Sequence, residues 1–195
     1  MIEFVTGCMF CGKTEELIRR LRRENIAGKK VILFKPKLDS RYSEDSVKTH
    51  DGISFDSINI ENSDELYSYL DYDVIGIDEV QFFDESVITF CRKFGENKLI
   101  VVSGLNMDFR GEPFRFRDSF KHVGELLALS RVTYLTAVCT CEENGEICGR
   151  EAEFSQRLIN GKPASYDDKL VVVGGRETYE ARCKKHHFVT GKKIV

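Results

Sequence analysis

The 195-residue sequence lacks any apolar run long enough to cross a bilayer, and it lacks internal repeats and low-complexity segments. It also lacks an excess of basic residues. Its formal net charge of −3 disfavours a general nucleic-acid binder or a membrane-surface protein, because such proteins are usually basic. A glycine motif begins at residue 7, which leaves no room for a signal peptide. We therefore expect a cytoplasmic protein with neither a nucleic acid nor a membrane as its partner.

Cysteine, in contrast, is abundant, with seven residues. Without a secretory signal, these are expected to be thiols and metal ligands rather than a disulfide framework. Hydrophobic residues make up 42% of the chain and charged residues 31%, which is the balance of an ordinary globular protein. The length suits one α/β domain with a small appendage.

The stretch "FVTGCMFCGKTEEL" contains the pattern G-x-x-x-x-G-K-T at residues 7–14. Gly7 and Gly12 permit backbone angles that let successive N–H groups approach a polyphosphate. Lys13 supplies a charge to the outer phosphates, and Thr14 supplies a hydroxyl ligand for magnesium. The alternative is a chance glycine turn, which the full eight-residue match disfavours. The motif therefore predicts a site for the phosphates of a nucleotide.

Strands and helices alternate along most of the chain, which predicts a mostly parallel sheet covered by helices. The predicted strands are Ile2–Thr6, "KKVILFKP" (29–36), "YDVIGIDEVQFF" (72–83) and "KLIVVSGLN" (98–106), and the predicted helices are Lys13–Asn25, Ser63–Leu70, Asp84–Phe94 and Asp118–Ser130. The polar stretch 37–52 is long for a loop and predicts a lid, a binding loop or a disordered segment. The alternation stops at Cys139. We therefore predict two domains, a nucleotide-binding domain over 1–137 and a smaller domain over 138–195.

Four arginines, Arg19, Arg20, Arg22 and Arg23, surround the apolar positions of the first predicted helix. They could form a nucleic-acid patch, but a solvated helix face is the favoured interpretation.

Two neighbouring acids follow the apolar run "VIGI". Asp78 is expected at the carboxyl end of a strand, where α/β sheets bind ligands, and Glu79 is next to it. Since neighbouring residues on a strand face opposite ways, one carboxylate can serve the magnesium while the other accepts a proton. The alternative is a pair of solvated acids at a strand end.

Six of the seven cysteines fall into two groups. Cys8 and Cys11 are spaced like a zinc half-site, but a metal bound inside the glycine loop would distort it, so we interpret them as small packing residues. The second group supplies the candidates for a structural zinc site, which are Cys139, Cys141, Cys148, Cys183, His186 and His187. Of these, Cys183-x-x-His186 has the spacing of a zinc half-site. The upstream half remains ambiguous between Cys139 and Cys141.

Together these pieces resemble the zinc-containing type II thymidine kinase family over nearly the whole chain. The resemblance is carried by "TGCMFCGKTEELIRRLRR", "KLDSRYSEDSVKTHDG", "IDEVQFF", "GLNMDFRGEPF", "QRLINGKPASYDD" and "GGRETYEARCKKHH". It implies a P-loop NTPase-like parallel sheet flanked by helices, with a small C-terminal zinc-binding domain that carries a lasso-like lid. It also implies transfer of the γ-phosphoryl group of ATP to the 5′-hydroxyl of thymidine, with deoxyuridine as a further candidate substrate. Magnesium, a structural zinc and a homotetramer are implied as well.

The resemblance assigns roles to individual residues. Glu79 would be the general base. The ATP and magnesium site would comprise Gly7, Cys8, Met9, Phe10, Cys11, Gly12, Lys13, Thr14, Asp39, Arg41, Asp78, Glu79, Val80 and Gln81. The nucleoside site would comprise Met9, Phe82, Leu105, Phe109, Phe114, Leu170, Val171, Val172, Val173, Gly174 and Tyr179. Each of these phenylalanines, taken alone, could equally be an ordinary core residue.

The resemblance also selects the zinc ligands, which would be Cys139, Cys148, Cys183 and His186. Cys148 precedes "GREAEFSQR" as the second family cysteine would, and Cys139 follows "TAV" as the first one does. "CTCEENGEIC" then replaces the usual compact C-x-x-C, with an insertion looped out between the two cysteines. Two further departures are cysteines at positions 8 and 11, where proline and serine are usual, and Asn106, where aspartate is common.

Two other functions are compatible with parts of the sequence. A nucleic-acid-dependent P-loop ATPase with a zinc ribbon would share the glycine loop and the Cys/His cluster, but the acidic balance and the lack of a basic, aromatic-studded groove disfavour it. A regulatory nucleotide-binding switch without turnover is disfavoured by Glu79 beside Asp78.

Overall fold

The computed structural model describes residues 1–37, 46–48, 54–171 and 178–192. The chain forms two compact units. The first, here called the sheet unit, comprises Met1–Thr6, Lys13–Leu105 and Phe114–Tyr134, and the second, the cysteine unit, comprises Gly7–Gly12, Asn106–Pro113 and Leu135–Val195. The cysteine unit therefore includes Gly7–Gly12 and Asn106–Pro113 in addition to the C-terminal part of the chain. The domain boundary that the sequence places near residue 137 stays a prediction.

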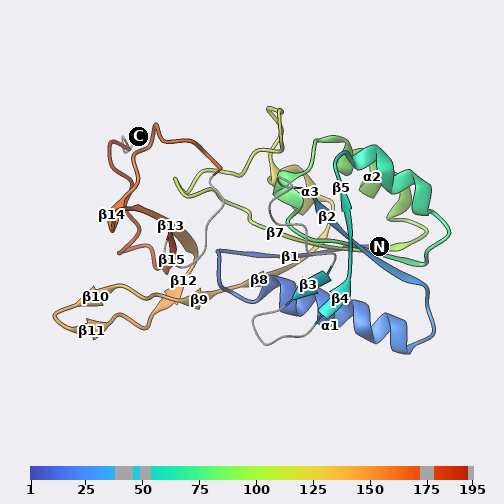
Figure 1. Cartoon of the computed structure of the whole chain (residues 1–195), viewed down its shortest axis with the longest axis horizontal. Coiled ribbons are helices and arrows are strands. Elements are labelled where there is room, and N and C mark those ends of the chain that lie inside the picture. Colours follow the sequence, from blue (N-terminus) through green and yellow to red (C-terminus); the bar gives the residue numbers. More distant parts are fainter. Residues whose placement is uncertain (38–45, 49–53, 172–177, 193–195) are drawn as a thin grey trace. The chain divides into compact units, whose positions relative to one another are not determined.

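The sheet unit is built on a six-stranded sheet in the order β5-β2-β6-β7-β1-β8 (Figure 1). Its strands are β1 (Ile2–Gly7), β2 (Val31–Pro36), β5 (Ile58–Ile60), β6 (Val74–Ile77), β7 (Leu99–Gly104) and β8 (Arg131–Leu135). The four ladders that join β5, β2, β6, β7 and β1 are all parallel, which confirms the predicted architecture. The carboxyl ends of these five strands therefore lie at one edge of the sheet.

Helices cover both faces of this sheet. They are α1 (Lys13–Ile26), α2 (Ser86–Phe94) and α3 (Val123–Ala128), with 3₁₀ helices η2 (Ser63–Tyr69) and η3 (Val80–Phe82). Figure 1 shows α1 on one side of the sheet and α2 with α3 on the other. Successive residues of β2 explain this arrangement, because they point to opposite faces. Leu33 packs against α1, whereas the ring of Phe34 packs edge-on against Tyr69 of η2 at 5.0 Å, and η2 in turn contacts α2.

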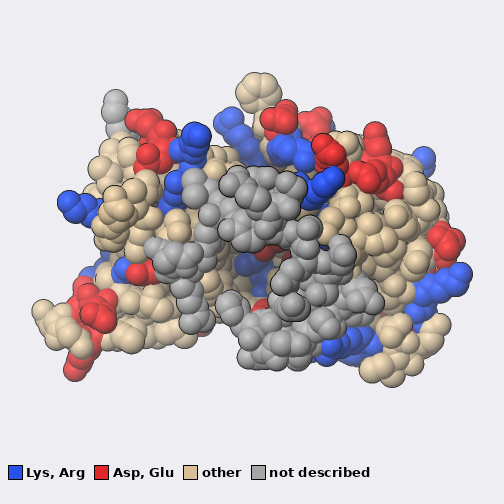
Figure 2. Space-filling model, in the orientation of Figure 1, with Lys and Arg blue, Asp and Glu red and all other residues tan. Residues whose placement is uncertain are grey.

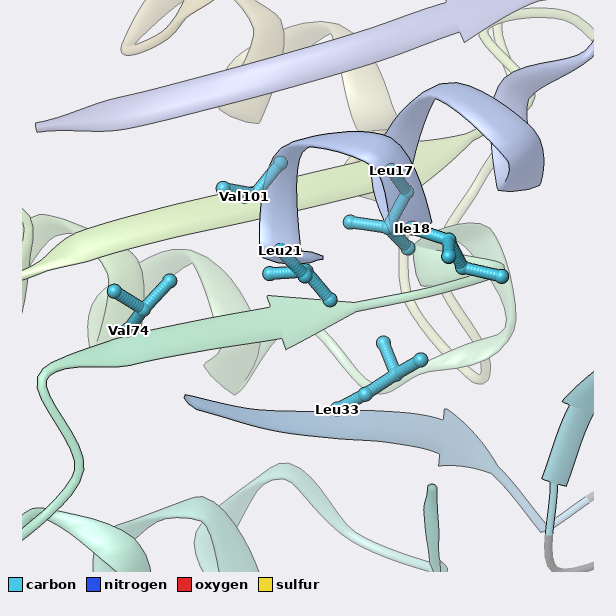
Figure 3. Close-up of a cluster of buried hydrophobic side chains, with 6 residues drawn as sticks. All are labelled: Leu17, Ile18, Leu21, Leu33, Val74 and Val101. Carbon is cyan, nitrogen blue, oxygen red and sulfur yellow. The ribbon is translucent and has the colours of Figure 1, made fainter. Parts of the chain in front are cut away.

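The core beneath α1 consists of Leu17, Ile18, Leu21, Leu33, Val74 and Val101 (Figure 3). Leu17, Ile18 and Leu21 recur at helical spacing and are buried, as the sequence predicted. Gly76 on β6 lets α1 approach closely, because a Cβ there would lie 2.6 Å from Cδ1 of Leu21. This packing fixes the start of α1, and with it Lys13 and Thr14, over the sheet.

The helix predicted over 63–70 is confirmed, as the 3₁₀ helix η2 over Ser63–Tyr69. Two other predicted elements were wrong in extent. The strand predicted over 72–83 ends at Ile77, because Glu79 adopts a left-handed conformation with φ 51°. The helix predicted over 118–130 contains only Val123–Ala128, because Asp118 has φ 53° and the N-terminal flanking residue His122 is extended.

The cysteine unit consists of short antiparallel pieces. Its strands are β9 (Ala137–Val138), β10 (Glu142–Glu143), β11 (Glu146–Ile147), β12 (Glu151–Ala152), β13 (Phe154–Ile159), β14 (Lys162–Pro163) and β15 (Tyr179–Arg182). They form the sheets β14-β13-β15, β12-β9 and β10-β11. The sheet unit contains a further antiparallel pair, β3 (Ser46–Lys48) with β4 (Ser54–Asp56). Of these, β3 lies in the polar stretch 37–52, most of which is outside the described residues. Within the described ranges, no helix combines the length and the apolar composition needed to cross a membrane.

Candidate active site and metal centre

Asp78 lies at the edge of the sheet where the parallel strands end. Its position follows from the register, which pairs Ile77 of β6 with Val102 of β7 and therefore brings the next residues, Asp78 and Ser103, side by side. Asp78 is buried, and its Oδ1 accepts hydrogen bonds from the Ser103 hydroxyl and, at 3.1 Å, from the backbone N–H of Glu79. Two donors thus hold the carboxylate in one orientation.

Thr14, in the first turn of α1, faces the same carboxylate. Its Oγ1 lies 3.4 Å from Oδ1 and 3.3 Å from Oδ2 of Asp78. Burial, followed by the negative charge of Glu79, raises the pKa of Asp78 to about 6, although the Ser103 hydrogen bond and the positive charge of Lys35 oppose the shift. A buried carboxyl that is costly to ionise, beside a hydroxyl at the end of a glycine loop, suits a divalent cation, which would supply the missing positive charge.

Glu79 is held separately from Asp78. The prediction that the two acids are consecutive residues of a strand is wrong. The strand ends at Ile77, and Glu79 takes left-handed angles, φ 51° and ψ 43°. A side-chain amide N–H of Gln81 donates to Oε2 of Glu79, and Oε1 of Gln81 accepts the backbone N–H of Leu105 at 3.0 Å. Gln81 is itself buried, so it links the second carboxylate to the residue that follows β7. The structure therefore gives the two acids different partners at the same edge.

The glycine loop has the unusual backbone that the motif predicted, with φ of 145° at Gly7, 66° at Phe10 and 84° at Gly12. Gly7 has a second requirement, since a Cβ there would lie 2.1 Å from the backbone oxygen of Leu135 at the end of β8. Any side chain at position 7 would therefore collide with main chain as well as strain the backbone.

Cys8 packs into the core of the cysteine unit, in agreement with its interpretation as a packing residue. It is buried in a cluster with Cys139, Ala152, Ala181 and Cys183, and its Sγ donates to the backbone oxygen of Ala152 at 3.2 Å. Cys11 is half-buried against the same cluster. The backbone N–H of Met9 donates to Oγ of Ser155 at 2.9 Å. The side chain of Cys8 thus faces β12, whereas the contact of the loop with β13 is made by the backbone N–H of Met9.

The residues predicted to contact the nucleoside form two groups. In the cysteine unit, Met9, Phe109, Leu170 and Tyr179 belong to one apolar cluster, together with Phe10, Ala164, Tyr166 and Val189. In the sheet unit, the rings of Phe82 and Phe114 make an edge contact at 5.7 Å, and Leu105 is bound to Gln81 as described. Val80 is buried, and Val171 is exposed. Asp39, Arg41, Val172, Val173 and Gly174 lie outside the described residues.

Two arginines that the sequence analysis did not single out hold the segment before Leu170. Nη2 of Arg110 donates to the backbone oxygen of Asp168 at 3.0 Å, and Nη1 of Arg157 donates to that of Lys169. The guanidinium carbon of each arginine also lies 5.3 Å from the centroid of the Phe109 ring. The same two arginines therefore contact both the segment before the predicted lid and Phe109, an aromatic residue of the predicted nucleoside site.

The zinc candidates separate clearly in the structure. Cys139, Cys148, Cys183 and His186 have ligand atoms that all lie within 4.8 Å of one another, and Cys141 and His187 are outside this group. Nε2 of His187 instead lies 2.8 Å from the backbone oxygen of Phe109, and its ring stacks on Phe154 at 4.7 Å. Three thiols and one imidazole match the donor set and number of a closed tetrahedral zinc site.

A β-hairpin brings Cys148 back beside Cys139. Its two strands, β10 and β11, are joined by Asn144 and Gly145, with φ of 55° and 82°, as in the type I′ turn that Asn-Gly favours. The backbone N–H of Cys148 donates to the oxygen of Cys141 at 2.8 Å, and that of Gly149 to the oxygen of Cys139 at 3.1 Å. The insertion in "CTCEENGEIC" is thus looped out, as predicted. Its Asn-Gly pair was a hairpin signal that the sequence analysis missed.

Cys148 also has a cationic neighbour. Nε of Arg150 donates to its Sγ at 3.1 Å, and this hydrogen bond is the main reason that the pKa of the Cys148 thiol is lowered to about 6. A metal-binding cysteine must be a thiolate, so this environment fits a ligand.

The parallel sheet, the glycine loop before α1 and the buried Asp78 at the end of β6 are those of the P-loop-like α/β class of proteins. Comparison with known proteins narrows this class. The family model described as thymidine kinase matches residues 1–187. A curated thymidine kinase from Coprothermobacter proteolyticus (strain ATCC 35245 / DSM 5265 / OCM 4 / BT) is 48% identical over 197 residues, which cover 100% of this chain and 93% of that relative. The chain therefore belongs to the thymidine kinase family, and it is a kinase.

Proposed function

We propose that the protein transfers the γ-phosphoryl group of ATP to the 5′-hydroxyl of thymidine, giving dTMP for the salvage of pyrimidine deoxynucleotides. Deoxyuridine is a second candidate substrate. The family membership supports this reaction. The observation that carries it is the contact of Thr14 with Asp78, at 3.3 Å, beside a second carboxylate that has its own partner. Phosphoryl transfer needs a phosphate cradle, a cation and one base. The glycine loop would supply the cradle, Thr14 with Asp78 would bind the cation, and Glu79 would be the base.

The proposed roles follow from the positions of the residues. Thr14 and Asp78 would hold Mg²⁺, which when bound neutralises charge on the transferring phosphates. The backbone of Gly7–Gly12 and the ammonium group of Lys13 would bind the triphosphate at the amino end of α1. Glu79 would accept the proton of the 5′-hydroxyl, and the Gln81 amide would hold its carboxylate in place.

The nucleoside would be held by apolar and aromatic side chains. Met9, Phe109, Leu170 and Tyr179 already cluster, and Phe82 packs against Phe114. Flat aromatic walls suit a pyrimidine base, and they offer little to a ribose or a phosphate. Arg110 and Arg157 would position Leu170 through the carbonyl groups that they bind, so that the lid starts from a fixed point.

A structural zinc would be held by Cys139, Cys148, Cys183 and His186. The short strands of the cysteine unit bury little apolar surface around this group, and zinc binding would add folding energy that such a segment lacks. Four protein ligands leave no coordination position for a substrate or water, so the zinc would stabilise the fold and take no part in the transfer.

We further propose that the protein acts in the cytoplasm, as a homotetramer, without a nucleic-acid partner. The surface charges support the last point. On the face drawn in Figure 2, Lys and Arg are interspersed with Asp and Glu among the described residues. On α1, Arg19 pairs with Glu16 at 2.6 Å, and Arg20 pairs with Glu16 and with Glu3 at 2.8 and 2.7 Å. These two arginines are therefore neutralised by acids, which favours a solvated helix face over a phosphate-binding one.

The proposed reaction is tested by incubating the purified protein with ATP, Mg²⁺ and each deoxynucleoside in turn, and separating the nucleotides formed. We expect dTMP from thymidine, a smaller yield of monophosphate from deoxyuridine, and none from purine deoxynucleosides. Parallel reactions contain single-stranded DNA in place of nucleoside. ATP hydrolysis that rises with DNA and not with thymidine would favour a nucleic-acid-dependent ATPase and contradict the proposal.

A further inference from the structure

The two ring nitrogens of His186 have different surroundings. Nδ1 lies 3.5 Å from Sγ of Cys139 and therefore faces the thiol cluster. Nε2 is buried, and Oε1 of Glu143 lies 2.9 Å from it. This distance is that of a hydrogen bond, although the N–H direction of Nε2 is not aligned with the carboxylate oxygen well enough for a regular one. Glu143 thus occupies the side of the ring that points away from the thiols.

Glu143 reaches this place because of the insertion between Cys139 and Cys148. It is the last residue of β10, directly before the Asn144–Gly145 turn, and it pairs with Glu146 of β11. A two-residue turn leaves no freedom of register, and a slip of one residue would move the side chain to the other face of the hairpin.

Lys185 also binds the carboxylate of Glu143. Its Nζ lies 2.8 Å from Oε1 and 3.0 Å from Oε2 of Glu143, and Lys185 directly precedes His186. The charges also balance around the cluster. Three thiolates with Zn²⁺ carry one net negative charge, Glu143 adds another, and Lys185 and Arg150 offset them, Arg150 through its 3.1 Å contact with Cys148.

We propose that Glu143 is a positioning residue for the metal centre, and this proposal rests on the zinc site proposed above. Its carboxylate accepts the Nε2–H of His186, which leaves Nδ1 unprotonated and directed at the metal. A carboxylate in this place fixes both the tautomer and the orientation of a metal-binding histidine and makes it a stronger ligand. The hairpin inserted between the two cysteines therefore supports the metal site in addition to bringing Cys148 into place.

The competing explanation is that Glu143 makes only an exposed ion pair with Lys185. Exposed pairs of this kind contribute little, so in that case the loss of Glu143 would leave metal binding unchanged. Glu146 is the matched control, because it is an exposed glutamate opposite Glu143 on the same hairpin.

The test uses the zinc-loaded full-length protein and measures zinc release to a colorimetric chelator for wild type, Glu143→Ala, Glu143→Gln and Glu146→Ala. We expect Glu143→Ala to release zinc about 10-fold to 100-fold faster. Glu143→Gln should fall between Glu143→Ala and wild type, because its amide oxygen can still accept a hydrogen bond from Nε2–H but carries no charge. Glu146→Ala should behave as wild type. Substitution with Co²⁺ adds a spectroscopic readout, in which the tetrahedral absorption bands of Glu143→Ala should shift and those of Glu146→Ala should not.

Equal release rates for Glu143→Ala and Glu146→Ala, with unshifted cobalt bands, would overturn the role of Glu143 and leave the zinc site intact. A wild-type protein that binds neither metal would overturn the zinc site and, with it, this proposal. Neither result depends on thymidine phosphorylation, which is measured separately on the wild type. Glu143→Gln has nearly the same shape as the native residue, so it reports on the interaction even if the alanine variant unfolds.

Discussion

Thr14 and Asp78 are 64 residues apart in the sequence, yet Oγ1 of Thr14 lies within 3.4 Å of both carboxylate oxygens of Asp78. The contact exists because α1 begins where the glycine loop ends and packs against β6 and β7, while Asp78 follows β6 directly. A hydroxyl and a buried carboxylate are thereby brought together at the edge of the sheet where the parallel strands end.

Asp78 should make the stability of the cation-free protein depend on pH. Its pKa is raised by burial from 3.8 to about 6. The folded state therefore holds the proton more tightly than the unfolded chain, so the contribution of Asp78 to the free energy of unfolding is highest below pH 3.8 and falls as the pH rises to about 6. Asp78→Asn should remove this fall, which would be up to about 3 kcal/mol.

The same variant should no longer be stabilised by Mg²⁺. Chemical denaturation at several pH values, with and without Mg²⁺, measures both effects. Two results would contradict the role of Asp78 as a cation ligand in a buried site. One is a free energy of unfolding that changes with pH in the same way for wild type and Asp78→Asn. The other is an Asp78→Asn protein that Mg²⁺ stabilises as much as wild type.

Glu79 should act in the transfer step rather than in ATP binding. Glu79→Gln keeps the shape of the side chain but cannot accept the hydroxyl proton, so we expect kcat to fall by about 10² or more with the Kd for ATP nearly unchanged. Steady-state kinetics measure kcat, and equilibrium binding measures the Kd for ATP. An equal loss of ATP affinity would place Glu79 on the cation instead.

Gly7 should tolerate no side chain, for a reason beyond its positive φ. Gly28 is the matched control, since it also has a positive φ, of 82°, but a Cβ there would meet nothing within 4 Å. We expect Gly28→Ala to cost about 1 kcal/mol of stability and to keep full activity. Gly7→Ala should cost at least about 2 kcal/mol and lose most of its turnover, because the 2.1 Å approach to Leu135 forces the loop to move.

Thermal unfolding and initial rates, measured side by side for these two glycine variants, test this comparison. Similar losses for both would mean that the close approach of Leu135 is unimportant.

Cys139 and Cys141 should differ in their effect on zinc content. Cys139→Ser removes a member of the four-residue group and should abolish bound zinc, whereas Cys141→Ser should retain one zinc per chain. Elemental analysis of the two purified variants decides between them. Zinc kept by Cys139→Ser and lost by Cys141→Ser would reverse the assignment.

Much of the sheet unit could be predicted from the sequence, because its signals are local. The apolar runs of β1, β2 and β7 and the helical spacing in α1 appear where they were expected. The strand over 72–83 could not be predicted at its true length. Its apolar residues continue past Ile77, and only the left-handed backbone of Glu79 ends it. That conformation is set by tertiary contacts such as the bonds of Gln81 to Glu79 and Leu105.

The surroundings of the candidate sites depended still more on long-range contacts. The four candidate zinc ligands could be chosen by spacing and resemblance, but the partner of His186 could not, because Glu143 reaches it through a hairpin 43 residues earlier in the chain. The packing of the glycine loop against Ala152 and Ser155 could not be predicted from the sequence either, because these residues are far from the loop along the chain. One local signal was present and not used, the Asn144–Gly145 pair.

The central claim is that this protein phosphorylates the 5′-hydroxyl of thymidine through the group formed by Lys13, Thr14, Asp78 and Glu79. The most direct measurement is ³¹P NMR of a reaction with ATP, Mg²⁺ and either thymidine or 5′-deoxythymidine, which lacks the reacting hydroxyl. We predict a new phosphomonoester resonance, coupled to the 5′ protons, with thymidine alone, and none with the Lys13→Ala protein. Phosphate on the 3′-oxygen, a product from 5′-deoxythymidine, or near-normal product from Lys13→Ala would contradict the account.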